Sequence, residues 1–278
     1  MNIKAFSTEW VGRRVDYYDV IASTNEQAKK EAQKDAAHGT LIVADMQTAG
    51  KGRRGRSWES PAGTNIYFSL LLRPSFVVEK ASMLTLVMAY SVCRAIRRQT
   101  GLECGIKWPN DLVIDAKKVC GILTELQLME QGYAVIIGVG INVGKQCFDQ
   151  ELQYKATSLA DALAVRRIGN ERYQEESFGR GLQEQLSREL LLGEIMRCFE
   201  EDYGQFRVAQ SLKEFMEEYN NMLVNLNRQV RVLDPKGEYS GIARGINEAG
   251  ELLVETEAGR SVAVYAGEVS VRGIYGYV

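Results

Sequence analysis

Residues 50–56, Gly-Lys-Gly-Arg-Arg-Gly-Arg, place three glycines and four cations in seven positions. A buried strand is excluded, because its charges would be taken out of water, and a helix is disfavoured, because each interior glycine costs about 1 kcal/mol. The segment is therefore predicted to be a mobile, positively charged loop whose backbone can approach a ligand and present N–H groups to an anion. Since it has no apolar side chain, nothing in the loop itself is expected to hold it down.

The glycine spacing of this loop also matches Gly-x-Gly-x-x-Gly, which binds dinucleotides when a strand precedes it and a helix follows directly. Residues 41–44 are apolar and predict the strand, but residues 57–63, Ser-Trp-Glu-Ser-Pro-Ala-Gly, have no helical period. The Rossmann interpretation is therefore rejected. Two interpretations remain open at this point, a loop that handles a polyphosphate and a solvated basic turn or nucleic-acid patch.

Composition limits the partners of the loop. The 278 residues carry a net charge of -2, so the basic loop is a local feature, which favours a small anionic ligand over bulk nucleic-acid binding. No apolar run approaches the ~20 residues of a membrane span, and residues 1–10 have no signal-peptide core. The five cysteines include no Cys-x-x-Cys pair and predict reduced thiols in a cytoplasmic protein.

The single histidine, His38, limits the chemistry. It is expected to lie at the surface, at the end of a helix that begins near Ser23, where Ser23 and Glu26 have the spacing of a capping box. A Ser-His-Asp triad or a histidine-rich zinc site is therefore disfavoured. Any catalysis should depend on cations, backbone donors and positioning, without a covalent enzyme intermediate.

The periodicity of apolar residues predicts an α+β protein in two domains, residues 1–226 and 227–278. Five short strands between residues 229 and 274 predict a small β-barrel. The larger domain is predicted to contain strands at 41–45, 65–72, 119–126 and 133–142, and helices at 81–99, 188–203 and 211–223.

A second unusual stretch, residues 106–114, reads Ile-Lys-Trp-Pro-Asn-Asp-Leu-Val-Ile. Proline cannot donate to a strand ladder, so the strand must break there, with a turn expected at residues 115–118. Gly121, Gly138 and Gly140 interrupt the strands that follow. They indicate either that a ligand lies against the backbone or that the strands bulge at a sheet edge.

Three segments together resemble the signature of the bacterial biotin–protein ligases: residues 50–58, Lys-Trp-Pro-Asn-Asp at 107–111 and Gly-Val-Gly-Ile-Asn at 138–142. Order and spacing hold, and the likeness extends from about Ser23 to Arg272. The resemblance implies a mixed β-sheet catalytic domain related to class II aminoacyl-tRNA synthetases, followed by an SH3-like barrel. It also implies that biotin is joined to AMP from Mg-ATP, without a tightly bound metal, and passed to a lysine of a biotin carboxyl carrier domain.

The resemblance assigns roles to particular residues. Lys118, Arg53 and Lys107 are implied to be catalytic. Biotin would be bound by Ser23, Thr24, Asn25, Gln47, Lys51, Gly52, Arg53, Lys118, Gly121 and Leu123, and the adenylate by Trp58, Asn110, Asn142, Lys107, Arg53 and Arg56. The residues-only interpretation of Ser23, Thr24 and Asn25, a helix cap, can coexist with the binding role.

Two departures from the family pattern bear on function. Lys51 stands where relatives have arginine, which keeps the charge but loses the planar fork. Relatives that double as repressors carry a DNA-binding domain ahead of the ligase, for which there is no room before Ser23. The chain therefore resembles the monofunctional class, with no repressor function, no nucleic-acid or membrane partner, and a monomeric or homodimeric state.

Two other functions remain to be weighed. A lipoate ligase or lipoyl transferase shares the fold and the acyl-adenylate chemistry, but is not expected to combine the basic loop with Lys-Trp-Pro-Asn-Asp. A nucleic-acid-binding regulator could use the loop and the barrel, but the near-neutral charge disfavours it.

Overall fold

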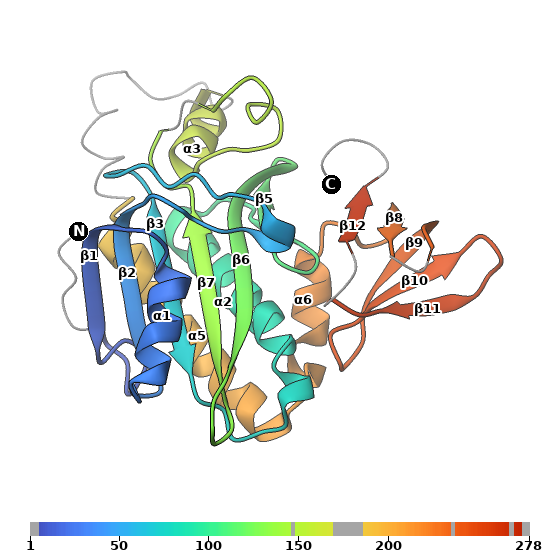
Figure 1. Ribbon diagram of the computed structural model, residues 1–278. Helices are drawn as coiled ribbons and strands as arrows, with labels where there is room; N and C mark the ends of the chain where they lie inside the picture. Colours follow the sequence, from blue (N-terminus) through green and yellow to red (C-terminus); the bar gives the residue numbers. More distant parts are fainter. Residues whose placement is uncertain (1–5, 146–147, 169–185, 235–236, 267–269, 274–278) are drawn as a thin grey trace.

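The computed structural model describes residues 6–145, 148–168, 186–234, 237–266 and 270–273, which form a large and a small sheet (Figure 1). In the described residues the large sheet has the order β1-β2-β3-β7-β6-β5-β4, and only β1 and β2 pair in parallel. The predicted mixed sheet is confirmed. Its strands are β1 (Val15–Ile21), β2 (Thr40–Gln47), β3 (Ile66–Leu72), β4 (Gly105–Lys107), β5 (Asp111–Ile114), β6 (Lys117–Leu128) and β7 (Tyr133–Ile141).

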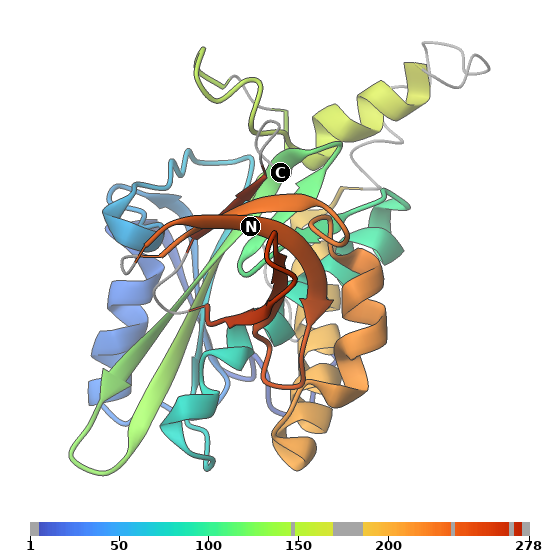
Figure 2. The same ribbon diagram turned by 90° about the vertical axis from the view of Figure 1, so that its right-hand side faces the viewer.

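Helices cover both faces of this sheet. Helix α1 (Thr24–Gln33) contacts β2, β3 and β7, whereas α2 (Met83–Thr100) contacts β4 to β7 and packs on α5 (Arg188–Ala209). Figure 2 shows α1 on one side of the sheet and α2 and α5 on the other. Because both faces are covered, β3 is buried at every position, and its apolar run follows from that. The alanines of α1 let the helix approach β2 closely, with Ala28 and Ala32 fully buried.

Helix α1 begins where it was predicted, after Ser23, but differs from expectation in its cap and in its C-terminal end. It ends at Gln33 rather than near residue 38. Asp35, two residues after that end, has a left-handed φ of 58°. Ser23 is the N-cap residue, but its side chain makes no capping hydrogen bond, so the predicted capping box is wrong. Glu26 instead pairs with Lys29 and Lys51.

The prediction that His38 is a surface residue at a helix end is also wrong. Its ring lies 4.4 Å from that of Trp10 and 5.6 Å from that of Tyr203, and its Nδ1 accepts the N–H of Arg73. Burial, with Arg207 and Arg73 nearby, lowers the pKa of His38. It therefore helps to hold the segment before β1 against α5.

The small sheet follows α6 (Met216–Met222) and has the order β11-β10-β9-β8-β12, all antiparallel. Its strands are β8 (Gln229–Leu233), β9 (Tyr239–Ile246), β10 (Leu252–Thr256), β11 (Ser261–Val264) and β12 (Ser270–Gly273). Within the described segments β11 and β12 do not pair, so the strands predicted at 229–274 form a sheet and no closed barrel is found. Trp108 joins the two sheets, because its Nε1 donates to the carbonyl oxygen of Gly250 at 3.0 Å.

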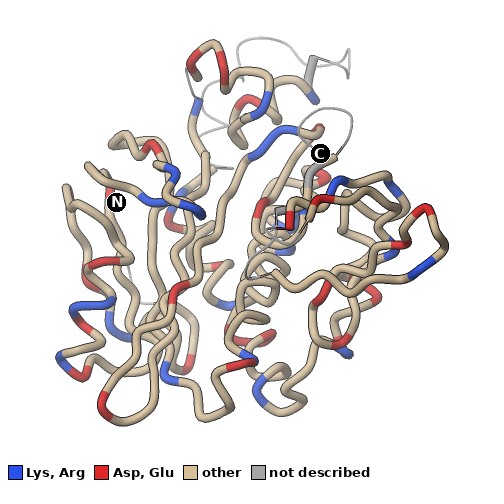
Figure 3. The backbone as a smooth tube through the Cα atoms, turned by 45° about the vertical axis from the view of Figure 1, so that its right-hand side comes forward, with Lys and Arg blue, Asp and Glu red and all other residues tan. Residues whose placement is uncertain are grey.

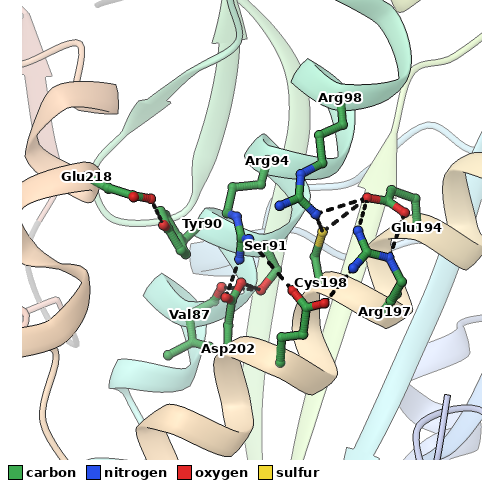
Figure 4. A network of polar contacts seen from close by, with 11 residues as sticks. Val87, Tyr90, Ser91, Arg94, Arg98, Glu194, Arg197, Cys198, Asp202 and Glu218 are labelled. Atoms are coloured by element: carbon green, nitrogen blue, oxygen red, sulfur yellow. Dashed lines mark hydrogen bonds and ion pairs between the residues drawn. The ribbon is translucent and has the colours of Figure 1, made fainter.

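A polar network lies between α2, α5 and α6 (Figure 4). Asp202, with only 1% of its side chain exposed, accepts hydrogen bonds from Arg94 and, at 2.7 Å, from Ser91 Oγ. Burial raises the pKa of Asp202 to about 6. Tyr90 donates to Glu218 on α6, so the network joins all three helices.

Two predictions from composition can be compared with the described part of the chain. Its four cysteines are free and buried, which agrees with reduced core thiols, while Cys147 lies outside the described residues. Among the described helices, none combines the length and the hydropathy needed to cross a membrane. Figure 3 shows basic and acidic residues interspersed along most of the chain, so the near-neutral net charge is not the sum of large separate acidic and basic regions.

Candidate active site

One pocket collects residues that are far apart in the sequence. It lies where the N-terminus of α1 and the segment after β2 meet β6 and β7, the strands in the middle of Figure 1. Its lining residues are Ser23, Thr24, Asn25, Gln47, Lys51, Gly52, Arg53, Trp58, Asn110, Lys118, Gly121, Ile122, Leu123, Gly138, Val139 and Gly140. All ten residues predicted to bind biotin are among them.

Three glycines on strands β6 and β7 line the pocket: Gly121, Gly138 and Gly140. A Cβ atom at Gly138 would lie 2.0 Å from Asn25 Oδ1, and one at Gly140 would lie 2.4 Å from Trp58 Nε1. The β6–β7 register runs unbroken through both positions, so these glycines are not bulges at a sheet edge. They are required because Asn25 and Trp58 lie directly on the strands, where the sequence had predicted a ligand or a bulge.

Replacing Gly138 with alanine is expected to destabilise the fold by about 1–3 kcal/mol, because the new methyl group overlaps the Asn25 amide. Urea denaturation measures the change. Gly204→Ala is the matched control: no atom lies within 4 Å of a Cβ there, and alanine is the better helix former. A Gly138→Ala protein as stable as the parent would contradict this close packing.

The amides at the start of α1 are fixed by hydrogen bonds. Gln47 Oε1 accepts from the backbone N–H of Thr24 at 2.9 Å and from its hydroxyl at 3.1 Å, so Gln47 satisfies one of the N–H groups at the start of the helix that have no partner within it. Asn25 Oδ1 accepts from Ser69 Oγ at 2.5 Å, and Asn25 Nδ2 donates to Glu125 Oε2 at 2.7 Å. The polar edge of the pocket is therefore preorganised.

Ser69 and Glu125 were not identified from the sequence. A lone serine within the apolar strand Ile-Tyr-Phe-Ser-Leu-Leu-Leu is a signal that could have been used for Ser69. Glu125 has no comparable signal, because its partner Asn25 lies 100 residues earlier in the chain.

Cations from two segments line the pocket, Lys51 and Arg53 from the loop and Lys118 from β6. Lys118 Nζ lies 2.6 Å from Asp111 Oδ1 and 5.1 Å from the centre of the Trp58 ring. Arg53 donates to Asn110 Oδ1 at 2.9 Å and to the carbonyl oxygen of Ala266 at 2.6 Å. Burial lowers the pKa of Arg53, and its neighbours Arg54 and Arg56 add to this effect. The pocket lining therefore carries three cationic side chains.

The loop at residues 50–56 is anchored by polar contacts, so the expectation that nothing holds it down is wrong. Gly52 N–H donates to the carbonyl of Arg56 at 2.7 Å, and Lys51 forms a β-bridge with Ser57. Arg54 adopts a left-handed φ of 58°. The contacts of Lys51 with Glu26 and of Arg53 with Asn110 tie the loop to both sides of the pocket.

Three residues predicted for the adenylate do not line the pocket. Lys107 is buried on β4, Arg56 is exposed, and Asn142 Nδ2 donates to the carbonyl of Thr157. Conversely, Ile122, Gly138, Val139 and Gly140 line it without having been predicted, although the glycines marked the place. Trp58 Nε1 is buried without an acceptor among the described residues, which makes it a candidate donor to a ligand.

A multidentate metal centre is not found in the described residues, since no group of three or more His, Cys, Asp or Glu side chains comes together there. The pocket lining offers hydroxyls, amides, an indole N–H, backbone groups of two strands and the cations Lys51, Arg53 and Lys118. Such a set is suited to a ligand with both amide-like and anionic parts.

Comparison with known proteins identifies the family. Residues 17–142 match the biotin/lipoate A/B protein ligase family, and residues 226–272 match the biotin protein ligase C-terminal domain. The bifunctional ligase/repressor BirA of Bacillus subtilis is 38% identical over 257 residues, which cover 91% of this chain and 72% of that protein. The chain belongs to the biotin protein ligase family.

Relatives of this chain include a bifunctional ligase/repressor and a protein named as a ligase alone. The biotin–[acetyl-CoA-carboxylase] ligase of Mycobacterium tuberculosis is 32% identical, with 92% of this chain and 88% of that protein covered. The biotin protein ligase from Aquifex aeolicus in complex with biotin and ATP is 29% identical with a TM-score of 0.72, covering 94% of this chain and 99% of that one. The predicted enzyme class is confirmed, and these relatives favour it over a lipoate ligase.

Proposed function

We propose that this protein ligates biotin to a specific lysine of a biotin carboxyl carrier domain, using ATP and a biotinyl-5'-AMP intermediate. The observation that carries the proposal is the convergence of all ten predicted biotin-binding residues on one pocket, with Trp58 and Asn110 beside them. The Aquifex relative was solved with biotin and ATP, which supports the same pair of substrates here.

The arrangement suggests how the first step proceeds. The fixed amides of Asn25 and Gln47 would bind the ureido ring, which offers both donors and acceptors. The biotin carboxylate would then lie near Lys118 and attack the α-phosphorus of ATP, releasing diphosphate. Lys118 and Arg53 would stabilise the negative charge that accumulates on the phosphate, because both are cations at the same pocket.

In the second step, the amine of the carrier lysine would attack the mixed anhydride, forming an amide and releasing AMP. Trp58 and Asn110 are proposed to bind the adenylate from the pocket wall. Lys107, Asn142 and Arg56 stay predictions for that role, since they lie outside the lining.

Direct transfer without a covalent enzyme intermediate is supported by the protonation of two buried cysteine thiols. Burial raises the pKa of Cys120, and it raises that of Cys198 to about 11, so both thiols stay protonated at neutral pH. His38 packs against Trp10, which is not part of the pocket.

Magnesium is proposed to arrive with ATP as part of the substrate. A magnesium ion bound by substrate phosphates needs only one or two protein carboxylates. Asp111 carries the carboxylate beside Lys118 and fits that requirement.

Several finer features stay proposals. We infer a catalytic domain of residues 1–226 that is similar to class II synthetases, and a domain of residues 227–278 in which the small sheet takes the place of the SH3-like barrel. A ligase without repressor function, acting as a monomer or homodimer, stays a prediction, since relatives include bifunctional ligase/repressors as well as ligases.

The proposal is tested by incubating the protein with Mg-ATP, either biotin or lipoate, and a biotin carboxyl carrier domain, with streptavidin detection of biotin and the mass gain of the carrier as a readout for either group. We expect transfer of biotin only, abolished when the acceptor lysine of the carrier is replaced with arginine. Exchange of diphosphate into ATP should require biotin but no carrier. Lipoyl transfer, or stable biotin on the denatured enzyme, would contradict the proposed reaction.

A further inference from the structure

Four side chains of alternating charge run from the loop to the pocket. Lys51 Nζ lies 2.8 Å from Glu26 Oε1, and Lys29 Nζ lies 3.1 Å from the same oxygen. Lys29 Nζ also lies 2.7 Å from Glu125 Oε1. The other oxygen of Glu125 accepts from Asn25 in the pocket, so the chain links the loop to a residue of the pocket lining.

Glu26 occupies the central place in this chain. Its carboxylate is not used to cap α1. Hydrogen bonds from Lys51, which has the larger effect, and from Lys29 lower the pKa of Glu26. It is therefore ionised at neutral pH. A single oxygen of Glu26 receives both lysines, which suits the point-like ammonium group of Lys51 better than a planar guanidinium.

Two of the contacts of the loop lie on opposite sides of the pocket. Lys51 attaches it to α1 through Glu26, whereas Arg53 attaches it to Asn110 and to Ala266 in the small domain. Because both attachments flank the pocket, release of either would open the loop on that side. The α1 attachment is the more exposed, with 50% of the Lys51 and 39% of the Glu26 side chain accessible.

We propose that Glu26 is a positioning residue: its carboxylate, held by Lys29, keeps Lys51 and therefore the loop over the pocket. Lys29 in turn is fixed by Glu125, so the loop and Asn25 share one set of charges. In the reaction proposed above, on which this part rests, the Glu26–Lys51 pair would slow escape of the acyl-adenylate to water.

The attachment is tested without substrates by limited trypsin digestion of the full chain at low salt. Glu26→Gln should speed cleavage after Arg54 or Arg56 by about threefold to fivefold, the range expected for an exposed ion pair. Glu59→Gln, which removes a charge just after the loop, is the matched control and should cut at the parental rate. At 1 M salt the difference should shrink, because charges are then screened over about 3 Å, the separation of the pair.

A variant that keeps the charge separates pairing from a general loss of structure. Glu26→Asp should be cut at Arg54 and Arg56 at a rate nearer to that of the parent than Glu26→Gln, whereas Glu26→Lys, which places like charges beside Lys29 and Lys51, should be cut faster than Glu26→Gln. Cleavage of Glu26→Gln at the parental rate, a difference undiminished at 1 M salt, or equal cleavage of Glu26→Asp and Glu26→Gln would each overturn the proposal.

A second measurement addresses retention of the intermediate. Glu26→Gln should release biotinyl-AMP into solution about threefold to fivefold faster than the parent, with the rate of its formation unchanged. Unchanged release together with faster trypsin cleavage would overturn the link between the loop and retention. A parent protein that makes no adenylate would refute the proposed function instead, while the digestion result would still decide the attachment.

Discussion

Replacement of Lys118 by alanine is expected to slow formation of the acyl-adenylate by about 10²–10³, the effect of losing one electrostatic donor to a transition state. The position of the side chain is the reason: its Nζ lies at the pocket, held between Asp111 at 2.6 Å and the face of Trp58. Single-turnover formation of biotinyl-AMP, measured with saturating biotin and ATP, reports this step directly.

Lys117→Ala provides the matched control. Lys117 precedes Lys118 on β6, and its Nζ donates to the carbonyl of Gln153 at 3.3 Å at an exposed site. Its loss should leave adenylate formation unchanged. A folded Lys118→Ala enzyme that forms the adenylate at the parental rate would exclude the assigned role.

Replacement of Arg94 by methionine is expected to lower the free energy of unfolding by about 3–5 kcal/mol at pH 8, because the buried Asp202 carboxylate loses its cation. Arg98→Met is the control. Arg98 is the arginine one turn later on α2, so the same side chain is removed. It is half-exposed and pairs with Glu194, so its replacement should lower the free energy of unfolding by about 1 kcal/mol or less.

The deficit of Arg94→Met should depend on pH. In the parent the pKa of Asp202 is raised to about 6 from an ordinary 3.8, so the native state binds the proton more tightly and stability falls as pH rises from about 4 to 6. Without Arg94 the pKa of Asp202 rises further. Protonation at low pH then relieves the unpaired charge, and the difference from the parent should shrink between pH 8 and pH 5. Urea denaturation at both pH values measures it, and an equal deficit at both would refute this account.

Features determined by neighbouring residues could be predicted from the sequence. Local residues predict three such features. Glycines and cations predict the loop, Pro109 predicts the strand break after Trp108, and a continuous apolar run predicts the buried strand β3. The residues predicted to bind biotin came from the family resemblance, and the structure brings them together in one pocket.

Features that depend on distant partners could not be predicted. The local spacing of Ser23 and Glu26 indicated a capping box, but Lys51 competes for the Glu26 carboxylate. The residues next to His38 in the sequence indicated a surface position. Its burial depends on Trp10 and Tyr203, which lie far from it in the sequence and pack against its ring. The loop was expected to be unanchored, because no local pattern shows that Arg53 meets Ala266, 213 residues later.

The two sheets are joined in part through main-chain atoms of the small domain. Trp108 donates to the carbonyl of Gly250, and Arg53 donates to that of Ala266. Every residue type carries a carbonyl oxygen, so this joint does not depend on which side chain occupies position 266. Gly250 is the exception, since its φ is 77° and a Cβ there would lie 2.8 Å from Leu212. In a deep mutational scan, position 266 should therefore tolerate other small residues, the size being limited because Ala266 is partly buried against the core, whereas one residue inserted between β11 and Ala266 should be as harmful as loss of Arg53 itself.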